Sequence, residues 1–305
     1  MRNAVVTRLG RRQSAAVVIS SGRARAFGSS NELLGFELHE RVLILNSDDL
    51  GMYEAVNEAV ISSIEDGVAS SCSLMVPCPG SAQALQLLAA RPHLRFGVHL
   101  TLVCDLPSAA WGPVTTRAAV PSLLSPSGTF LPPSGIPQLL ARARIEEVER
   151  EFRAQLEVVL RAGLSPTHLD WHCLADGGRE DVFEVTRALA REHGLATRAW
   201  LPSARTRLRG EGSPVVDHNF LDSFDVDLHD KVLTYVRMLR DLPPGLSEWA
   251  VHPGLDTEEA RGLDGGWRVR SSDHAFLTSS LARQVLSEEG IRVIDYSHLQ
   301  AASWP

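Results

Sequence analysis

From Arg41 onward, short apolar runs alternate with amphipathic stretches, and this rhythm constrains the fold more than any other feature. The apolar runs are too short for helices, and several are bounded by Pro or Gly, as is typical of buried strands. Seven runs are predicted as strands: 42–46, 71–76, 94–102, 166–172, 197–201, 248–252 and 291–296. Six intervening stretches are predicted as helices: 53–66, 80–91, 144–162, 180–193, 228–242 and 277–289.

Strands that alternate with helices pair in parallel through crossover connections. The pattern therefore predicts an α/β fold of about seven parallel strands, either an open doubly wound sheet or a closed or nearly closed barrel. The first strand is followed by Asp48-Asp49-Leu50-Gly51 rather than by Gly-x-Gly-x-x-Gly. This difference disfavours a dinucleotide site.

Composition excludes several other classes of protein. The apolar fraction is 44% and the charged fraction is 22%, as in ordinary globular domains. The net charge of −7 gives no support for nucleic-acid binding. No apolar run reaches the roughly 18 residues that a membrane span needs. The four cysteines include no Cys-x-x-Cys pair, which argues against a disulfide scaffold and a zinc ribbon.

The first 38 residues differ from the rest of the chain. They contain six arginines but only two acids, Glu32 and Glu37. The apolar run at 15–19 is shorter than the roughly 7–15 residues of a signal-peptide core. We therefore expect a flexible N-terminal arm over residues 1–38 and a single domain over 39–305. A transit peptide or a start codon placed too early would leave the same composition.

Acids and histidines gather at the ends of the predicted strands. In parallel α/β folds the C-terminal strand ends form one rim, where functional sites are built. We therefore expect polar groups from four separate segments to meet at this rim. These groups are Asp48, Asp49, His99, His168, Asp170, His172 and His252.

Two clusters among these residues point to a metal ion. His168, Asp170 and His172 are two residues apart, so they project from one face of a strand, where polar groups are costly unless paired or metal-bound. Asp48 and Asp49 are adjacent, and two gathered carboxylates favour a cation. A hydrogen-bonded polar cluster would also explain the first group, and a helix cap at Asp49 would explain the second.

Taken together, these segments resemble the YdjC-like carbohydrate deacetylase family, which includes chitooligosaccharide and hopanoid-biosynthesis deacetylases. The matching strings are LNSDDLG (45–51) followed by VNEAV (56–60), GVHLTL (97–102), SPTHLDWH (165–172) and VHPG (251–254). They occur in the same order between Arg41 and about Tyr296. The resemblance implies a distorted (β/α) barrel of the glycoside hydrolase/deacetylase type over residues 39–305.

The resemblance also implies a site. In that family one Asp and two His hold a divalent metal ion, here expected as magnesium or zinc. Carried over to this sequence, the metal ligands are Asp49, His99 and His172. Asp48 is then the candidate base and His252 the candidate acid. With a metal-activated water attacking the acetamide carbonyl, the expected activity is removal of an N-acetyl group from an amino sugar.

Four further residues belong to this expectation as supporting or substrate-binding groups. His168 and Asp170 lie in a matching string, and we expect them to support the ligands without touching the metal. Trp171 is a candidate for stacking on a sugar. Arg198, on the predicted fifth strand, is a candidate for binding substrate or for orienting an Asp.

The sequence departs from the family directly after His172. The family usually continues with further histidines, whereas this chain reads Cys173-Leu174-Ala175-Asp176. This change leaves the metal triad complete but puts the usual substrate in doubt. We expect Cys173 to be a core residue pointing away from the triad, because neighbours along a strand face opposite sides.

Three other functions fit parts of the pattern. His168-x-Asp170 with a distant His252 fits the two-histidine, one-carboxylate site of a non-haem iron oxygenase. The aspartate pair at 48–49 with Glu248 could serve a metal-free glycosidase. A sugar-binding relative without catalytic activity is the third.

The expected partner is an N-acetylated carbohydrate, and we expect neither a nucleic-acid partner nor a membrane span. We expect a cytoplasmic protein, with a homodimer as one possible state.

Overall fold

A computed structural model of the chain describes residues 29–219 and 221–303. Within these residues one sheet contains the strands β1 (Arg41–Leu50), β2 (Ser71–Leu74), β3 (Phe96–Leu100), β4 (His168–Trp171), β5 (Ala196–Thr197), β6 (Leu221–Asp222), β7 (Gly245–Val251) and β8 (Arg292–Val293). The strand order is β5-β4-β3-β2-β1-β7-β6, with β8 beside β1, and all these pairings are parallel. The prediction of a parallel α/β fold is confirmed.

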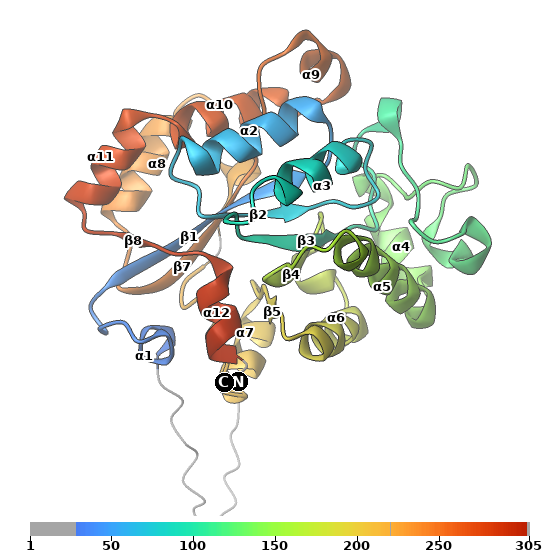
Figure 1. The fold of residues 1–305 in the computed structure, drawn as a ribbon, viewed down its shortest axis with the longest axis horizontal. Coiled ribbons are helices and arrows are strands. Elements are labelled where there is room, and N and C mark those ends of the chain that lie inside the picture. Colours follow the sequence, from blue (N-terminus) through green and yellow to red (C-terminus); the bar gives the residue numbers. More distant parts are fainter. Residues whose placement is uncertain (1–28, 220, 304–305) are drawn as a thin grey trace, which may run out of the picture.

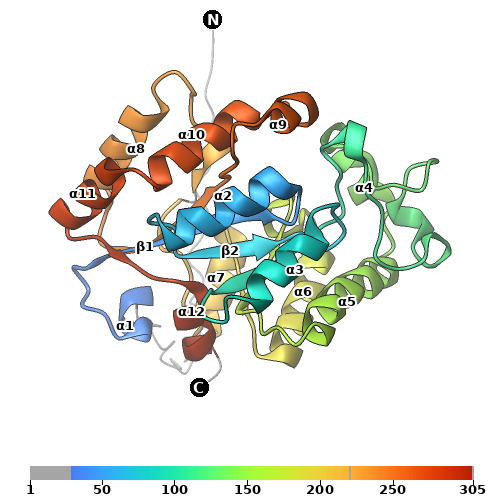
Figure 2. The ribbon, with the colours of Figure 1, turned by 45° about the horizontal axis from the view of Figure 1, so that its top comes forward.

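The sheet curls into an open, barrel-like shape, as Figures 1 and 2 show. Strands β5 and β6 stand at the two ends of the strand order and are not paired with each other in the described part of the chain. The predicted distorted barrel is therefore present in an incompletely closed form. Strand β6 escaped prediction because a two-residue strand shows no hydrophobic periodicity.

Helices pack around the sheet. They are α1 (Ser30–Leu34), α2 (Glu54–Glu65), α3 (Ser81–Ala89), α4 (Ile136–Arg142), α5 (Ile145–Arg161), α6 (Glu180–His193), α7 (Pro202–Gly210), α8 (Lys231–Arg240), α9 (Glu258–Leu263), α10 (Trp267–Leu277), α11 (Ser280–Glu288) and α12 (Tyr296–Ser303). Helices α2, α3, α5 and α6 follow one another around the sheet (Figure 2). Each of the six predicted helices overlaps one of those observed. In the described residues no helix is both long and apolar enough to cross a membrane.

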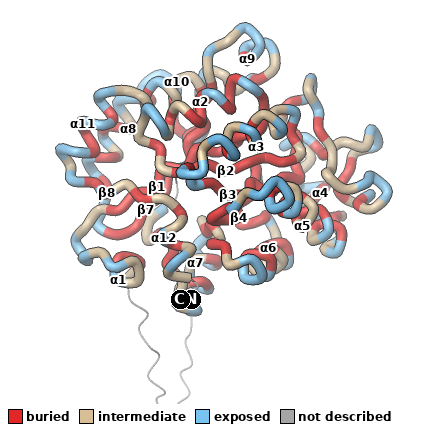
Figure 3. The backbone as a smooth tube through the Cα atoms, in the orientation of Figure 1, coloured by how far each residue is buried: buried red, intermediate tan, exposed pale blue. Residues whose placement is uncertain are grey.

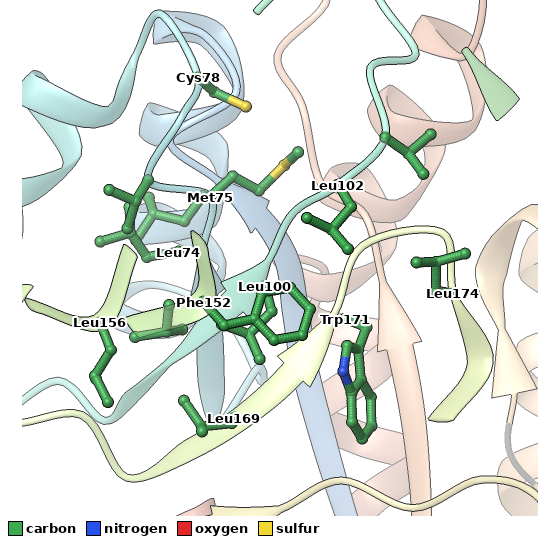
Figure 4. Close-up of a cluster of buried hydrophobic side chains, with 14 of the residues drawn as sticks. Leu74, Met75, Cys78, Leu100, Leu102, Phe152, Leu156, Leu169, Trp171 and Leu174 are labelled. Carbon is green, nitrogen blue, oxygen red and sulfur yellow. The ribbon is translucent and has the colours of Figure 1, made fainter. Parts of the chain in front are cut away.

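Helix α5 illustrates how the sequence pattern becomes a core. Phe152, Leu156 and Val159 recur at helical spacing and are buried. Phe152 and Leu156 lie against Leu100 of β3 and Leu169 of β4, as the close-up in Figure 4 shows. Burying a side chain of this size contributes about 1.5–3 kcal/mol to stability. Strands β2, β3, β4 and β7 are accordingly buried at every position, while the outer helix surfaces are exposed (Figure 3).

The N-terminal boundary of the domain lies earlier than predicted. Residues 29–38 were assigned to the arm, yet they contain α1, and Ser30 and Asn31 are buried. The Asn31 side-chain amide donates to the carbonyl oxygens of Glu37 and Glu40, each at 2.9 Å. These ten residues therefore belong to the packed domain. The rest of the predicted arm, residues 1–28, lies outside the described residues.

We expect Asn31→Ala to destabilise the protein by about 1–3 kcal/mol, because it removes both donors and leaves two carbonyl groups without these partners. Urea unfolding of the full chain measures the effect. His39→Ala, at a neighbouring exposed position, is the control and should stay within about 0.5 kcal/mol of the wild type. Equal midpoints for all three proteins would contradict the packing role of α1.

Candidate metal and catalytic site

A cavity of about 350 Å³ lies at the C-terminal ends of the strands. It collects most of the acids and histidines that the sequence places there. Its lining is Asp48, Asp49, His99, Asp105, Trp171, His172, Cys173, Ala175, Trp200, Asp222, Phe224, His252 and Arg270.

Asp49, His99 and His172 converge inside this cavity. Oδ1 of Asp49 lies 3.5 Å from Nε2 of His99 and 3.1 Å from Nδ1 of His172. One atom from each side chain lies within 4.8 Å of the others, which is compact enough for one metal ion. Asp49 has a left-handed φ of 71°, a strained conformation for a residue other than Gly and one that concentrates at functional sites.

Carboxylates stand behind both histidines. Oδ1 of Asp170 lies 2.9 Å from Nδ1 of His99, and Oδ1 of Asp105 lies 3.2 Å from Nε2 of His172. Such partners orient a ligating imidazole and raise its basicity. Burial alone would lower the pKa of His99, but Asp170 and Asp48 outweigh burial and raise it to about 10. The surroundings therefore favour positive charge at this point, as a cation site requires.

Arg270, on α10, contacts the other carboxylate oxygen of Asp49. Its Nη2 lies 2.8 Å from Oδ2 of Asp49, and its Nε donates to Oδ2 of Asp264 at 2.6 Å. Oδ1 of Asp49 is thus left for the triad. The glycine of VHPG makes this contact possible, because a Cβ at Gly254 would lie 2.9 Å from Cβ of Arg270.

Asp48 points into a buried ionic network. Arg198 donates to its two oxygens at 2.8 and 2.9 Å. The same guanidinium lies 2.8 Å from Oδ2 of Asp170 and donates to Oε1 of Glu248 at 2.8 Å. Burial would raise the pKa of Asp48, but Arg198 and His99 outweigh burial and lower it. Asp48 is therefore held ionised, 3.9 Å from Nε2 of His99.

Arg198 does not occupy the substrate-binding place expected for it. It is 1% exposed, and it is absent from the cavity lining because its guanidinium is directed at three buried carboxylates. The other reading from the sequence, that Arg198 orients an Asp, matches these contacts. Trp171 does line the cavity, and its indole N–H donates to the hydroxyl of Thr186 at 3.0 Å, which sets the plane of the ring.

His252 lies on another wall of the cavity, directly after β7. Its Nδ1 is 2.8 Å from the hydroxyl of Ser223 and 3.8 Å from Oδ1 of Asp222, at the end of β6. Its backbone N–H donates to Oδ2 of Asp273 at 2.9 Å. The ring of Phe224 packs edge-on at 4.8 Å. These contacts fix the imidazole of His252 at the cavity edge.

His168 lies beneath the cavity rather than in its lining. Its ring stacks on Tyr296 at 3.7 Å, and its Nε2 lies 3.8 Å from Oδ2 of Asp170. Gly97 is required here, because a Cβ at that position would lie 2.5 Å from the His168 ring. The clusters in the described residues that could hold a metal ion include neither His168 nor His252, so the ligand set of the oxygenase alternative is not assembled.

Glu248 is also unavailable to a substrate. It is 1% exposed, accepts from Arg198, and accepts from the Tyr296 hydroxyl at 2.7 Å. Burial raises its pKa to about 7 despite the nearby guanidinium. The glycosidase alternative needs a second carboxylate in contact with the sugar, and this glutamate lies outside the cavity lining.

Cys173 differs from its expected position. Cys173 is exposed, and its thiol lies 3.3 Å from Nε2 of His172, so it faces that imidazole instead of the core. Its backbone has a left-handed φ of 59°, which breaks the alternation of a strand after β4. No local sequence pattern predicts this turn, since positive φ is uncommon for residues other than Gly.

Four contributors to the site were missed by sequence reasoning: Asp105, Asp222, Ser223 and Arg270. Asp105 follows β3 in a long loop that buried Glu151 of α5 anchors by accepting from the backbone N–H groups of Val114 and Thr115 at 2.9 and 3.1 Å. Neither this long loop nor α10, whose apolar residues show little helical periodicity, contains a local sequence signal for these site residues. Only Gly254 could have indicated a close approach at this point.

Comparisons with known proteins place this chain among relatives of one family. A family model described as YdjC-like protein matches residues 42–288. The carbohydrate deacetylase of Geobacillus stearothermophilus is 31% identical over 84% of this chain and 97% of its own length, and that of Clostridium beijerinckii is 33% identical over 84% and 99%. Among solved structures, a proposed cellobiose-phosphate cleavage protein of Enterococcus faecalis V583 superposes with a TM-score of 0.73 at 26% identity, covering 85% of this chain and 99% of its own.

Proposed function

Because this chain belongs to the family of YdjC-like proteins, we propose that it is a carbohydrate deacetylase, a hydrolase that removes the acetyl group from an N-acetylated amino sugar or a related conjugate. One observation carries the proposal. A compact triad of Asp49, His99 and His172 shares a single cavity with the ionised Asp48 and with His252. Metal-dependent hydrolysis of an amide uses a metal site, a base and an acid around one substrate.

The donor set suits a divalent ion. One carboxylate and two imidazoles are ligands that Zn²⁺ accepts while keeping a position open, and Mg²⁺ is the alternative with oxygen-richer preferences. When bound, such an ion lowers the pKa of a water molecule and polarises the acetyl carbonyl. Asp105, Asp170 and Arg270 orient the three ligands. Elemental analysis of the purified protein identifies the metal.

Asp48 and His252, on either side of the triad, transfer the protons. Asp48 accepts the proton of the attacking water, and the Arg198 contacts keep its carboxylate oriented and ionised for that step. His252 donates a proton to the nitrogen of the departing amine, which leaves poorly until protonated. Ser223 and the backbone contact to Asp273 hold this imidazole in place.

Acetate release from a panel of N-acetylated sugars tests the proposal. Phe224, which is 43% exposed, offers apolar ring surface in the cavity for a sugar face. Release from at least one amino sugar is expected, and the preferred member of the panel identifies the substrate class. Binding of sugars without any acetate release would instead favour the inactive sugar-binding alternative. A cytoplasmic location and a homodimeric state stay predictions.

We expect His252→Gln to lower the rate of acetate release by about 10²- to 10⁴-fold, the usual contribution of a general acid. The bound metal should stay at the wild-type level, because His252 is not part of the triad. His229→Gln, at an exposed position, serves as the control. Rate assays with metal analysis on both variants check the assignment. Loss of metal from His252→Gln would contradict the assignment of His252 as the general acid.

A further inference from the structure

The two ring nitrogens of His172 face different groups. Nδ1 faces Asp49 of the triad, with Oδ1 at 3.1 Å. Nε2 faces outward, where Oδ1 of Asp105 lies at 3.2 Å and Sγ of Cys173 at 3.3 Å. The atoms of this second group also lie within 4.8 Å of one another. His172 thus stands between two sets of metal-ligating atoms.

We propose that Asp105, His172 and Cys173 form a second metal position, selective for thiophilic divalent ions such as Zn²⁺ and Cd²⁺. In a tetrahedral zinc site with ordinary bond lengths, the ligand atoms are separated by about 3.3 Å for N and O and about 3.6 Å for N and S. The separations around Nε2 are close to both values. A thiolate ligand favours soft ions over Mg²⁺ or Ca²⁺.

The backbone and the exposure of Cys173 support this assignment. An extended residue after β4 would direct its side chain away from that of His172. The left-handed φ of 59° instead brings the thiol to the imidazole. Cys173 is also exposed, whereas Cys72, Cys78 and Cys104 are buried, so an ion from solvent reaches this thiol directly.

Occupation of the second position opposes the proposed deacetylase activity, and this consequence rests on the proposed function. A neutral imidazole offers one lone pair, so His172 ligates through one ring nitrogen at a time. An ion on Nε2 leaves a proton on Nδ1, which then donates to Asp49 instead of binding the catalytic ion. Excess Zn²⁺ or Cd²⁺ therefore removes one ligand from the triad.

Titration of the full-length protein with Cd²⁺, followed by its ultraviolet thiolate-to-cadmium charge-transfer absorption, tests the site without an activity assay. The wild type should develop the band. Cys104→Ser is the matched control and should also develop it, because the Cys104 thiol is next to Asp105 in sequence but contacts the carbonyl oxygen of Leu106. Cys173→Ser should not. His99→Ala should keep the band, because His99 is not part of the second position. If His99→Ala fails to fold, Asp49→Asn takes its place in this test.

Persistence of the band in Cys173→Ser, or its loss in both His99→Ala and Asp49→Asn, would overturn the second position. In the acetate assay, each protein's rate in a tenfold molar excess of Zn²⁺ is compared with its own rate at one equivalent of Zn²⁺. The excess should slow the wild type by a factor at least ten times larger than the factor for Cys173→Ser. Equal inhibition would overturn the competition for His172. A cadmium band in a protein that releases no acetate would support the site while counting against the deacetylase function.

Discussion

Chelation of the divalent ion is expected to abolish acetate release, and one equivalent of added ion should restore it. The reason is that the ion supplies both the activated water and the polarised carbonyl, and no residue of the cavity replaces these roles. Dialysis against a chelator, with elemental analysis before and after, measures the loss and recovery. We expect a fall beyond the roughly 10²- to 10⁴-fold effect of losing a single proton-transfer residue, because two roles are lost together.

The control for chelation is a test that the metal-free protein is still folded. Thermal melting of the stripped protein should remain cooperative, since the cavity is tied together by Arg198 and Arg270 independently of the ion. Restoration of activity by added ion separates loss of catalysis from unfolding. Full activity in a protein shown to contain no metal would overturn the mechanism.

Asp48→Asn and Asp49→Asn should fail in different ways. Asp49→Asn removes the anionic ligand, so both the bound metal and the rate of acetate release should fall. Asp48→Asn removes the base but none of the three triad residues, so the metal should stay near one equivalent while the rate falls by about 10²- to 10⁴-fold. Metal analysis and acetate release on the two purified variants distinguish the roles of these neighbouring carboxylates.

Melting curves accompany this comparison, because Asp48 and Asp49 each neutralise a buried arginine. Breaking a buried ion pair costs up to about 3–5 kcal/mol, although the near-isosteric Asn retains one acceptor oxygen. Asp66→Asn, at an exposed position, controls for the general effect of losing a charge. If Asp48→Asn lost the metal and Asp49→Asn kept it, the two roles would be reversed; if neither lost metal, the triad would be wrong.

Much of the fold was predictable from local pattern. The apolar run at 42–46 and the alternating polar and apolar residues at 166–172 are long enough to show strand character. The spacing of Phe152, Leu156 and Val159 shows a helix without reference to the rest of the chain. The two-residue strand β6 and the short helices α7 and α9 were not predictable. Elements this short form because neighbours pack against them, so their own sequence contains little periodic signal.

The convergence of Asp48, Asp49, His99, His172 and His252 followed from the sequence, because parallel strands bring their C-terminal ends to one rim whatever their order. The partners of these residues depended on the tertiary structure. Arg198 lies 150 positions after Asp48, and Arg270 comes from a helix far beyond the triad.

Cys173 shows the same division within a single residue. Its position after β4 was evident from the sequence, but the left-handed turn that directs its thiol to His172 was not. The sequence by itself determined which chemical groups reach the rim, since strand periodicity and order are local properties. Only the tertiary structure decided which charges neutralise one another and where each side chain points, because those depend on contacts between segments distant in the chain.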